Sequence, residues 1–248
     1  MTLARLDGRK GLLRQLDARL AALDTSGALT AFDDKHRQAF DLLSSTQAKH
    51  AFDLAREPQS VRDQYGRHQF GQSTLLARRL VEAGARFVMV DYGYDPDYGN
   101  VWDNHNAPVQ NHPPIQQMVK RGYHLAGMDR AFAALVSDLR DRGLLDSTLV
   151  VFLTEFGRTP KINATAGRDH WPTVFSVVLA GGGMKQGMIY GASNPVASEP
   201  DRDEVGPADL ATTLYYQMGI IADKELMAPG NRPIEIVDGG KVRKELLA

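Results

Sequence analysis

The sequence predicts an α/β protein with a largely parallel sheet and helices on its faces. Apolar residues recur at helical spacing in residues 70–84 and 115–143. Short runs of β-branched and aromatic residues follow each of these segments, at 86–91 and 147–154. Helices and strands that alternate in this way usually build a parallel sheet between layers of helices.

Composition limits the possible functions. The 248 residues include 43% hydrophobic and 24% charged residues, and the formal net charge is -1. Such a balance without a dense Lys/Arg run argues against nucleic acid as a partner. No apolar run approaches the roughly 20 residues of a membrane span. The chain has no cysteine, which excludes disulfides, thiolate metal sites and a cysteine nucleophile.

The first part of the chain, residues 1–57, is expected to form a helical N-terminal segment. Leu12, Leu16, Leu20 and Leu23 recur at helical spacing, and Pro58 ends the segment. Residues 58–248 are then expected to form the α/β domain. No signal peptide begins at Met1, because the first ten residues are charged and lack an apolar stretch. The compartment is left open.

Within the second part, we expect a helix over 70–84 and a buried strand at 86–91. A loop at 92–114 follows, and its length suggests a function. One amphipathic helix is predicted for 115–143, ended by Gly143.

The remaining chain is predicted to contain three more strands and one helix. The strands are expected at 147–154, 174–179 and 187–190, and the helix at 207–218. Glycines 181–183 resemble a phosphate-binding loop only superficially, because the Lys-Ser/Thr pair of such a loop is missing. We therefore predict a turn there.

The loop at 92–114 carries the first candidate site residues. Asp103 and His105 are one residue apart, and carboxylate oxygen and imidazole nitrogen are common metal ligands. The same loop region also holds Asp91, Asp95, Asp97 and His112. The alternative is that Asp and Asn residues here are turn formers.

A second group follows the strand predicted at 147–154. Glu155 lies just past its end, where a carboxylate is placed to bind a metal or act as a general base, or to pair with Arg158 or Arg168. The two arginines suit an anion such as phosphate or sulfate, although they can also bridge carboxylates. His170 is a further candidate ligand, and the alternative is a hydrogen bond to Asp169.

The remaining histidines and serines are weaker candidates for functional residues. His36, His50, His68 and His124 lie on predicted helices and are interpreted as surface or packing residues. None of the serines stands in a G-x-S-x-G motif, so a serine-triad hydrolase has no support.

Several strings together resemble the domain-of-unknown-function 1501 family, which is similar to the sulfatases and belongs to the alkaline phosphatase-like superfamily. The most specific strings are Glu-Phe-Gly-Arg-Thr-Pro at 155–160 and Gly-Arg-Asp-His-Trp at 167–171. The others lie at residues 70–73, 76–84, 102–105, 148–154 and 179–183. The resemblance implies a three-layer α/β/α sandwich of the alkaline phosphatase and sulfatase type, of which this chain would hold the C-terminal part.

The resemblance also implies a site. It suggests Asp103, His105, Glu155 and His170 as ligands of a divalent metal, either zinc, manganese or calcium. It assigns Glu155, Arg158 and Arg168 to catalysis. Phe156 departs from the superfamily pattern, because it stands where a ligating histidine is usual. The superfamily's nucleophile and first metal ligand belong to an N-terminal half, and a full-length precursor would be exported.

Three functions are therefore expected as alternatives. The first is a metal-dependent hydrolase of phosphate or sulfate esters, with a small anionic or ester substrate. The second is a non-catalytic domain that forms a homo-oligomer through an open sheet edge. The third is a metal-assisted carboxylester hydrolase on the same scaffold.

Overall fold

The computed structural model describes residues 45–95, 99–100 and 102–248, and positions 8, 9, 11, 34, 35 and 41. Most of the helical segment predicted for 1–57 lies outside these described residues. The helices are α3 (Thr46–Phe52), α4 (Gln59–Tyr65), α5 (Gln69–Glu82), α6 (Ile115–Met118), α7 (Leu125–Asp141) and α8 (Pro207–Gln217). Short 3-10 helices are η1 (Leu54–Arg56), η2 (Leu145–Ser147) and η3 (Lys244–Leu246).

Helices α4, α5 and α7 pack together around a small apolar core. Tyr65, Leu75 and Ala134 form its centre. Gly71 allows α4 and α5 to meet, because a Cβ at this position would lie 2.2 Å from the carbonyl oxygen of Tyr65. As predicted, α5 and α7 end just before glycines, since Gly84 (φ 98°) and Gly143 (φ 68°) adopt the left-handed conformation that suits a helix terminus.

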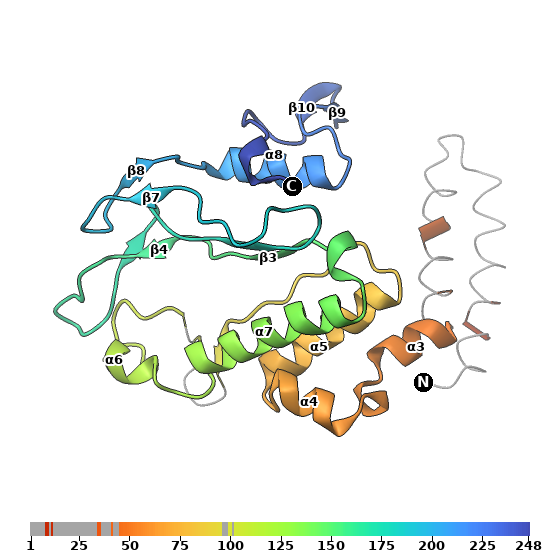
Figure 1. Ribbon diagram of the computed structural model, residues 1–248, viewed down its shortest axis with the longest axis horizontal. Helices are drawn as coiled ribbons and strands as arrows, with labels where there is room; N and C mark the ends of the chain where they lie inside the picture. The colour runs from red at the N-terminus through yellow and green to blue at the C-terminus, as the bar shows by residue number, and fades with distance from the viewer. Residues whose placement is uncertain are drawn as a thin grey trace.

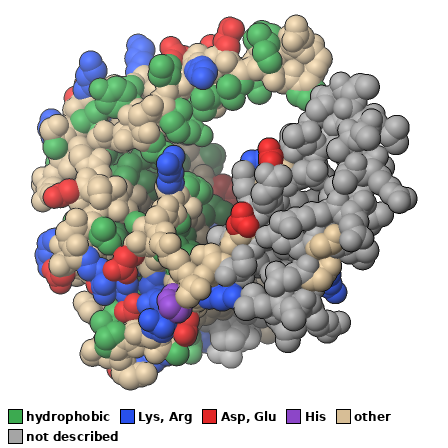
Figure 2. Space-filling model, turned by 90° about the vertical axis from the view of Figure 1, so that its right-hand side faces the viewer, with side chains coloured by type: hydrophobic (Ala, Val, Ile, Leu, Met, Phe, Trp, Pro, Cys, Tyr) green, Lys and Arg blue, Asp and Glu red, His purple; other side chains and the backbone are tan. Residues whose placement is uncertain are grey.

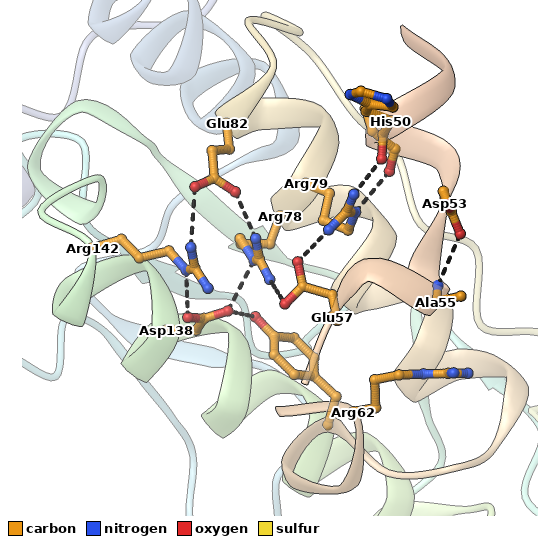
Figure 3. A network of polar contacts seen from close by, with 12 residues as sticks. His50, Asp53, Ala55, Glu57, Arg62, Arg78, Arg79, Glu82, Asp138 and Arg142 are labelled. Atoms are coloured by element: carbon orange, nitrogen blue, oxygen red, sulfur yellow. Dashed lines mark hydrogen bonds and ion pairs between the residues drawn. The ribbon is translucent and has the colours of Figure 1, made fainter. Parts of the chain in front are cut away.

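A buried ionic network joins the same helices (Figure 3). The side chain of Arg78 is fully buried and forms ion pairs with Glu57 (2.7 Å), Glu82 (2.6 Å) and Asp138 (2.9 Å). Arg142 adds contacts to Asp138 and Glu82 at 2.7 and 3.1 Å. Arg79 pairs with Glu57. The charges balance, because three guanidinium groups meet three carboxylates.

The strands are short and pair only in twos. They are β1 (Tyr94–Asp95), β2 (Gly99–Asn100), β3 (Val150–Phe152), β4 (Gly157–Arg158), β5 (His170–Trp171), β6 (Val178–Ala180), β7 (Ala192–Ser193), β8 (Pro200–Arg202), β9 (Glu225–Ala228) and β10 (Arg232–Glu235). The pairs are β1–β2, β3–β6, β4–β5, β7–β8 and β9–β10. The described residues thus form an α/β protein of helices and small sheets.

The predicted parallel sheet was wrong, because every pair among the described strands is antiparallel. In the central pair, Val150 of β3 lies opposite Ala180 of β6. A parallel pair needs a long crossover, usually a helix, between its strands. The chain between β3 and β6 instead contains the β4–β5 pair, which brings it back in the opposite direction.

Four strand predictions also need correction. Residues 86–91 form no strand, and Phe87 and Met89 are 75% and 79% exposed. A strand needs a partner for its backbone groups, and none of the described segments pairs with this one. Residues 187–190 are not a strand either. The predicted strands at 147–154 and 174–179 shrink to β3 and β6.

The helix predicted for 115–143 is interrupted. It becomes the single turn α6 and the long helix α7, separated by residues 119–124. Gly122 lies in this break, and glycine lowers helix stability by about 1 kcal/mol relative to alanine. The helix predicted for 207–218 is confirmed by α8, and the turn predicted at 181–183 is confirmed by three glycines with positive φ.

Figure 1 shows how these elements lie in space. The β3–β6 pair lies between α5 and α7 on one side and α8 on the other. Contact between Phe132 of α7 and Phe152 of β3, whose ring centroids are 5.9 Å apart, joins the helical side to the strands. Among the described residues, no helix combines the length and the apolar character that a membrane crossing demands.

Candidate metal centre

Three of the predicted ligands lie together. Asp103, His105 and His170 each offer one ligand atom, and these atoms all lie within 4.8 Å of one another. Asp103 Oδ1 is 2.6 Å from His105 Nδ1 and 3.6 Å from His170 Nε2. In a tetrahedral site with bonds of about 2.1 Å, neighbouring ligand atoms are about 3.4 Å apart. The His170–Asp103 separation is close to this spacing, whereas the His105–Asp103 hydrogen bond is shorter and would have to lengthen around a bound ion.

Two separate parts of the chain supply the cluster. Asp103 and His105 follow β2, where the Asn100 side chain accepts hydrogen bonds from the backbone N–H groups of Trp102 (3.0 Å) and Asp103 (3.3 Å). His170 lies on β5, directly opposite Arg158 of β4. The short β4–β5 pair thus brings His170 to the loop that carries Asp103.

Asn163 fastens the two parts to each other. Its Nδ2 donates to the carbonyl oxygen of His105 (2.8 Å) and to Asp169 Oδ1 (2.9 Å). Its Oδ1 accepts from Thr165 N (3.0 Å), Thr165 Oγ1 (2.8 Å) and Gly167 N (3.0 Å). Both ends of the amide are used, so Asn163 holds the loop before His170 against the backbone of His105. Sequence reasoning missed this residue, although an Asn three residues after Pro160 is a common turn former.

Gly167 permits this close approach. A Cβ there would lie 1.9 Å from the carbonyl oxygen of Asn104, a distance that no side chain can occupy. The neighbouring Arg168 N–H donates to the same carbonyl at 3.0 Å. The glycine of the Gly-Arg-Asp-His-Trp string is therefore required by contact with the Asp103 loop.

The two predicted catalytic arginines make backbone contacts in this centre. Arg158 donates to the carbonyl oxygens of Arg168 (3.1 Å) and Trp102, and its Nη2 lies 3.8 Å from Asp103 Oδ1. Arg168 donates to the carbonyl oxygen of Thr159 at 3.2 Å. Both side chains thereby tie neighbouring loops together, and both also line the adjacent cavity.

Phe156 has a role that the sequence did not reveal. Its ring lies against the His170 ring, with centroids 4.2 Å apart and planes tilted by 30°. The Arg158 guanidinium lies over the Phe156 ring, 5.4 Å from its centroid. Phe156 binds no metal, but it fixes the orientation of a histidine that can.

Glu155, the fourth predicted ligand, is not part of the cluster. It is exposed, lines the same cavity, and forms no hydrogen bond or ion pair with the described residues. The predicted pairing with Arg158 or Arg168 is therefore absent from the described contacts. The alternative for His170 was a hydrogen bond to Asp169. This bond is also absent from the described contacts, and His170 lies near Asp103 instead.

Electrostatics keep Asp103 ionised. Burial raises the pKa of the Asp103 carboxyl, but the hydrogen bond from His105, the contact with His170 and the charge of Arg158 together bring this pKa below its ordinary value. Burial also lowers the pKa of Arg158, although Asp103 and Asp169 oppose that change. An ionised carboxylate beside two imidazoles is a donor set that suits a divalent cation.

A cavity of about 690 Å³ opens beside the centre. Asp103, His170 and Glu155 belong to its wall, together with Arg158 and Arg168. The formal charges of these carboxylates and guanidinium groups cancel. A divalent ion held by the cluster would make the site positive, so the cavity would attract anions only when such an ion is bound.

Among the described residues of the 92–114 region, Asp103 and His105 are the ones that join the cluster. Asp91 is exposed and His112 is buried away from it, whereas Asp97 and the side chain of Asp95 lie outside the described residues. His68 caps α5 by accepting a hydrogen bond from Gly71 N at 3.2 Å, which agrees with a structural role. His124 is buried against Trp102, with ring centroids 4.3 Å apart, and it lines the cavity.

Comparison with known proteins gives one match. The family model described as "Protein of unknown function (DUF1501)" matches residues 1–247. No curated protein matches the chain, and no solved structure does.

Proposed function

The chain belongs to the DUF1501 family, and we propose that it is a metal-dependent hydrolase of small anionic esters. The observation that carries this proposal is the convergence of Asp103, His105 and His170, two of which, Asp103 and His170, line an open cavity. Two imidazoles and one carboxylate leave a coordination position for substrate, as in catalytic zinc sites. We further propose that the chain is related to the sulfatase-like, alkaline phosphatase-like superfamily and shares its α/β/α sandwich. The sequence strings around these ligands support this relation.

The donor set narrows the choice of metal. Asp103, His105 and His170 would hold the ion, and two imidazole ligands favour zinc over manganese and calcium, which are better suited to oxygen ligands. When bound, such an ion supplies Lewis-acid stabilisation of the charge that develops on the ester oxygens. The cation also supplies the positive charge that an anionic substrate needs here.

The protein's own groups have separate tasks in this proposal. Glu155 accepts a proton from the attacking water, because its carboxylate is exposed on the cavity wall and has no partner among the described residues. Arg158 and Arg168 hold the ligand loops through backbone carbonyls and turn their remaining N–H groups to an anion. Phe156 orients His170.

Metal content is the first test. Protein purified without chelator should contain zinc or manganese by emission spectroscopy, and His170→Ala should lose it. Asp223→Asn is the matched control, because Asp223 is exposed and lies outside the cluster. Metal-free wild-type protein that also fails to take up added zinc or manganese would overturn the proposal.

Hydrolysis is the second test. The p-nitrophenyl phosphate and sulfate esters should be cleaved, and activity should disappear with chelator. Glu155→Gln should reduce kcat about 100-fold or more while leaving the metal content unchanged. Glu204→Gln, which alters an exposed carboxylate outside the cavity, should have no effect. Cleavage of p-nitrophenyl acetate alone would support the carboxylester alternative instead.

A specific observation also favours an interaction function as the second candidate. Phe87, Met89 and Val178 are 75%, 79% and 45% exposed, and no other described strand pairs with the free edges of β3 and β6. On the face drawn in Figure 2, hydrophobic side chains reach the surface at several places, interspersed with polar and charged ones. Large exposed apolar patches usually mark contacts with other chains. A second copy of this chain is the partner that we propose.

Light scattering tests this candidate. The protein should form a stable dimer or larger oligomer, and the double variant Phe87→Ser/Met89→Ser should shift it toward monomer. Ile189→Ser is the control, because Ile189 is also exposed but lies elsewhere in the sequence. A wild-type monomer at high concentration would contradict the interaction function.

A further inference from the structure

The cavity beside the metal cluster has two chemically different walls. The loops at 102–104 and 154–170 contribute all of its carboxylates and guanidinium groups. The segment around α6 and the start of α7 contributes Ile115, Gln116, Val119, His124 and Leu125, none of which is Asp, Glu, Lys or Arg. We call these five residues the helical wall.

The helical wall exists because the helix predicted for 115–143 is interrupted. The break at 119–124 turns Val119 and Leu125 toward the same cavity, at the end of α6 and the start of α7. Leu125 remains 43% exposed, although leucine usually gains free energy from burial. Ile162, on the loop before His170, also lines the cavity and is 40% exposed. Several large apolar side chains thus remain open to whatever enters.

The helical wall is fixed relative to the cluster. The Ile115 N–H donates to the carbonyl oxygen of Ala166 at 3.0 Å, which joins α6 to the loop held by Asn163. His124, at the other end of the break, packs against Trp102, the residue before Asp103, with the two rings tilted by 46°. An entering molecule therefore meets the ligand cluster and the apolar wall at a constant separation.

The cavity is larger than an oxyanion alone needs. About 690 Å³ lies within the range of roughly 300–1,000 Å³ that is usual for sites of whole small molecules. A phosphate or sulfate group would fill only the part next to Asp103 and His170. The rest needs an occupant that matches apolar side chains.

We propose that the helical wall binds an alkyl or aryl group of the ester, while its anionic group lies at Asp103, His105 and His170. This inference rests on the proposed function and adds a substrate class to it: monoesters with an apolar organic group. Sugar phosphates and other polar esters are disfavoured, because their hydroxyl groups would lose hydrogen bonds to water against this wall.

A homologous series of ligands tests the proposal. Binding of n-alkylphosphonates from ethyl to octyl is measured by calorimetry on the zinc-loaded protein. Each added methylene that the wall buries should lower Kd about threefold to fourfold. Leu125→Asn and Val119→Asn should flatten this dependence without changing the zinc content. Ile221→Asn, an exposed apolar position outside the cavity, should leave it unchanged.

The test separates this inference from the proposed function. If zinc binds but Kd does not depend on chain length, or if Leu125→Asn keeps the full dependence, the helical wall proposal is overturned and the hydrolase proposal stands. The n-alkyl alcohols from butanol to octanol, titrated into chelator-treated protein, examine the wall without metal. A chain-length dependence that Leu125→Asn removes supports the wall even if no metal is found, and its absence overturns it.

Discussion

Asn163 controls the geometry of the candidate centre although it has no ligand role. Its Nδ2 donates to the carbonyl oxygen of His105, and its Oδ1 accepts from the N–H of Gly167. Replacing the amide nitrogen with oxygen therefore tests whether this connection positions the ligands. In Asn163→Asp, an oxygen replaces the donor and faces the carbonyl oxygen of His105 and the carboxylate of Asp169. Residues that orient ligands typically affect metal affinity 10- to 100-fold, so we expect a loss of about that size by chelator competition.

The control for this variant is Asn194→Asp. Asn194 makes a comparable local pattern, in which Nδ2 donates to Ser198 Oγ (2.9 Å) and Oδ1 accepts from Ser198 N (3.0 Å). It lies outside the ligand cluster. Equal zinc affinities in the two variants would show that Asn163 does not position the ligands.

Gly167 gives a second prediction at the scale of single residues. In Gly167→Ala, the added methyl would meet the Asn104 carbonyl at 1.9 Å, so the backbone must move. Overpacking of this kind costs about 1–3 kcal/mol, which urea unfolding measures. Gly122→Ala is the control, because Gly122 is exposed and its Cβ would have no neighbour within 4 Å. A similar stability of both variants would contradict the close contact.

Helices α4, α5 and α7 depend on the ionic network around Arg78. Removing Arg78 leaves three carboxylates with only two guanidinium groups, and an uncompensated charge in a buried ionic group costs about 3–5 kcal/mol. Arg78→Met should therefore lower the free energy of unfolding by about this amount in denaturant titrations. Arg140→Met breaks only the exposed pair with Asp141 and should cost at most about 1 kcal/mol. If Arg78→Met is as mild as this control, the network adds little to stability.

The same network predicts a dependence of stability on pH. Burial raises the pKa of Glu57, but hydrogen bonds from Arg78 and Arg79 and their charges outweigh burial, so the pKa falls below its ordinary value of 4.5. The unfolded chain then takes up the proton at a higher pH than the folded protein does. The stabilisation is complete above about pH 4.5 and is lost as pH falls through the lower pKa of the folded state. Glu57→Gln should be less stable at neutral pH and should show a shallower loss of stability below pH 4.5.

These elements also show what sequence can predict. The ends of α5, α7 and α8 follow local signals, namely Gly84, Gly143 and Pro207, and were predicted to within a few residues. The strands were not, because pairing is decided by segments far away in the chain. Residues 86–91 have strand composition but no partner among the described strands. The sequence also predicted three of the ligands that converge, namely Asp103, His105 and His170. It did not predict that Glu155 lies outside the cluster, because this depends on the direction of the turn after β3.

At the scale of the whole molecule, the centre links parts of the chain that are distant in sequence. An ion that binds only the folded protein stabilises it by about 2.7 kcal/mol when the free ion is at 100 times its Kd. Zinc should therefore raise the unfolding free energy of chelator-treated protein, and Asp103→Ala should abolish the increase. An equal increase in Asp103→Ala would place the bound zinc elsewhere.

The two tryptophans of the chain have a position that makes the protein its own spectroscopic probe. Trp102 precedes Asp103, and Trp171 follows His170, so each indole is the direct sequence neighbour of a candidate ligand. Both are held in place, since Trp171 Nε1 donates to Ser198 O at 2.8 Å and Trp102 Nε1 donates to Tyr92 O. Intrinsic fluorescence therefore reports on both halves of the centre at once. Quenching by a paramagnetic ion such as Co²⁺ would follow occupancy without any label, and replacing either tryptophan with phenylalanine would resolve which half responds first.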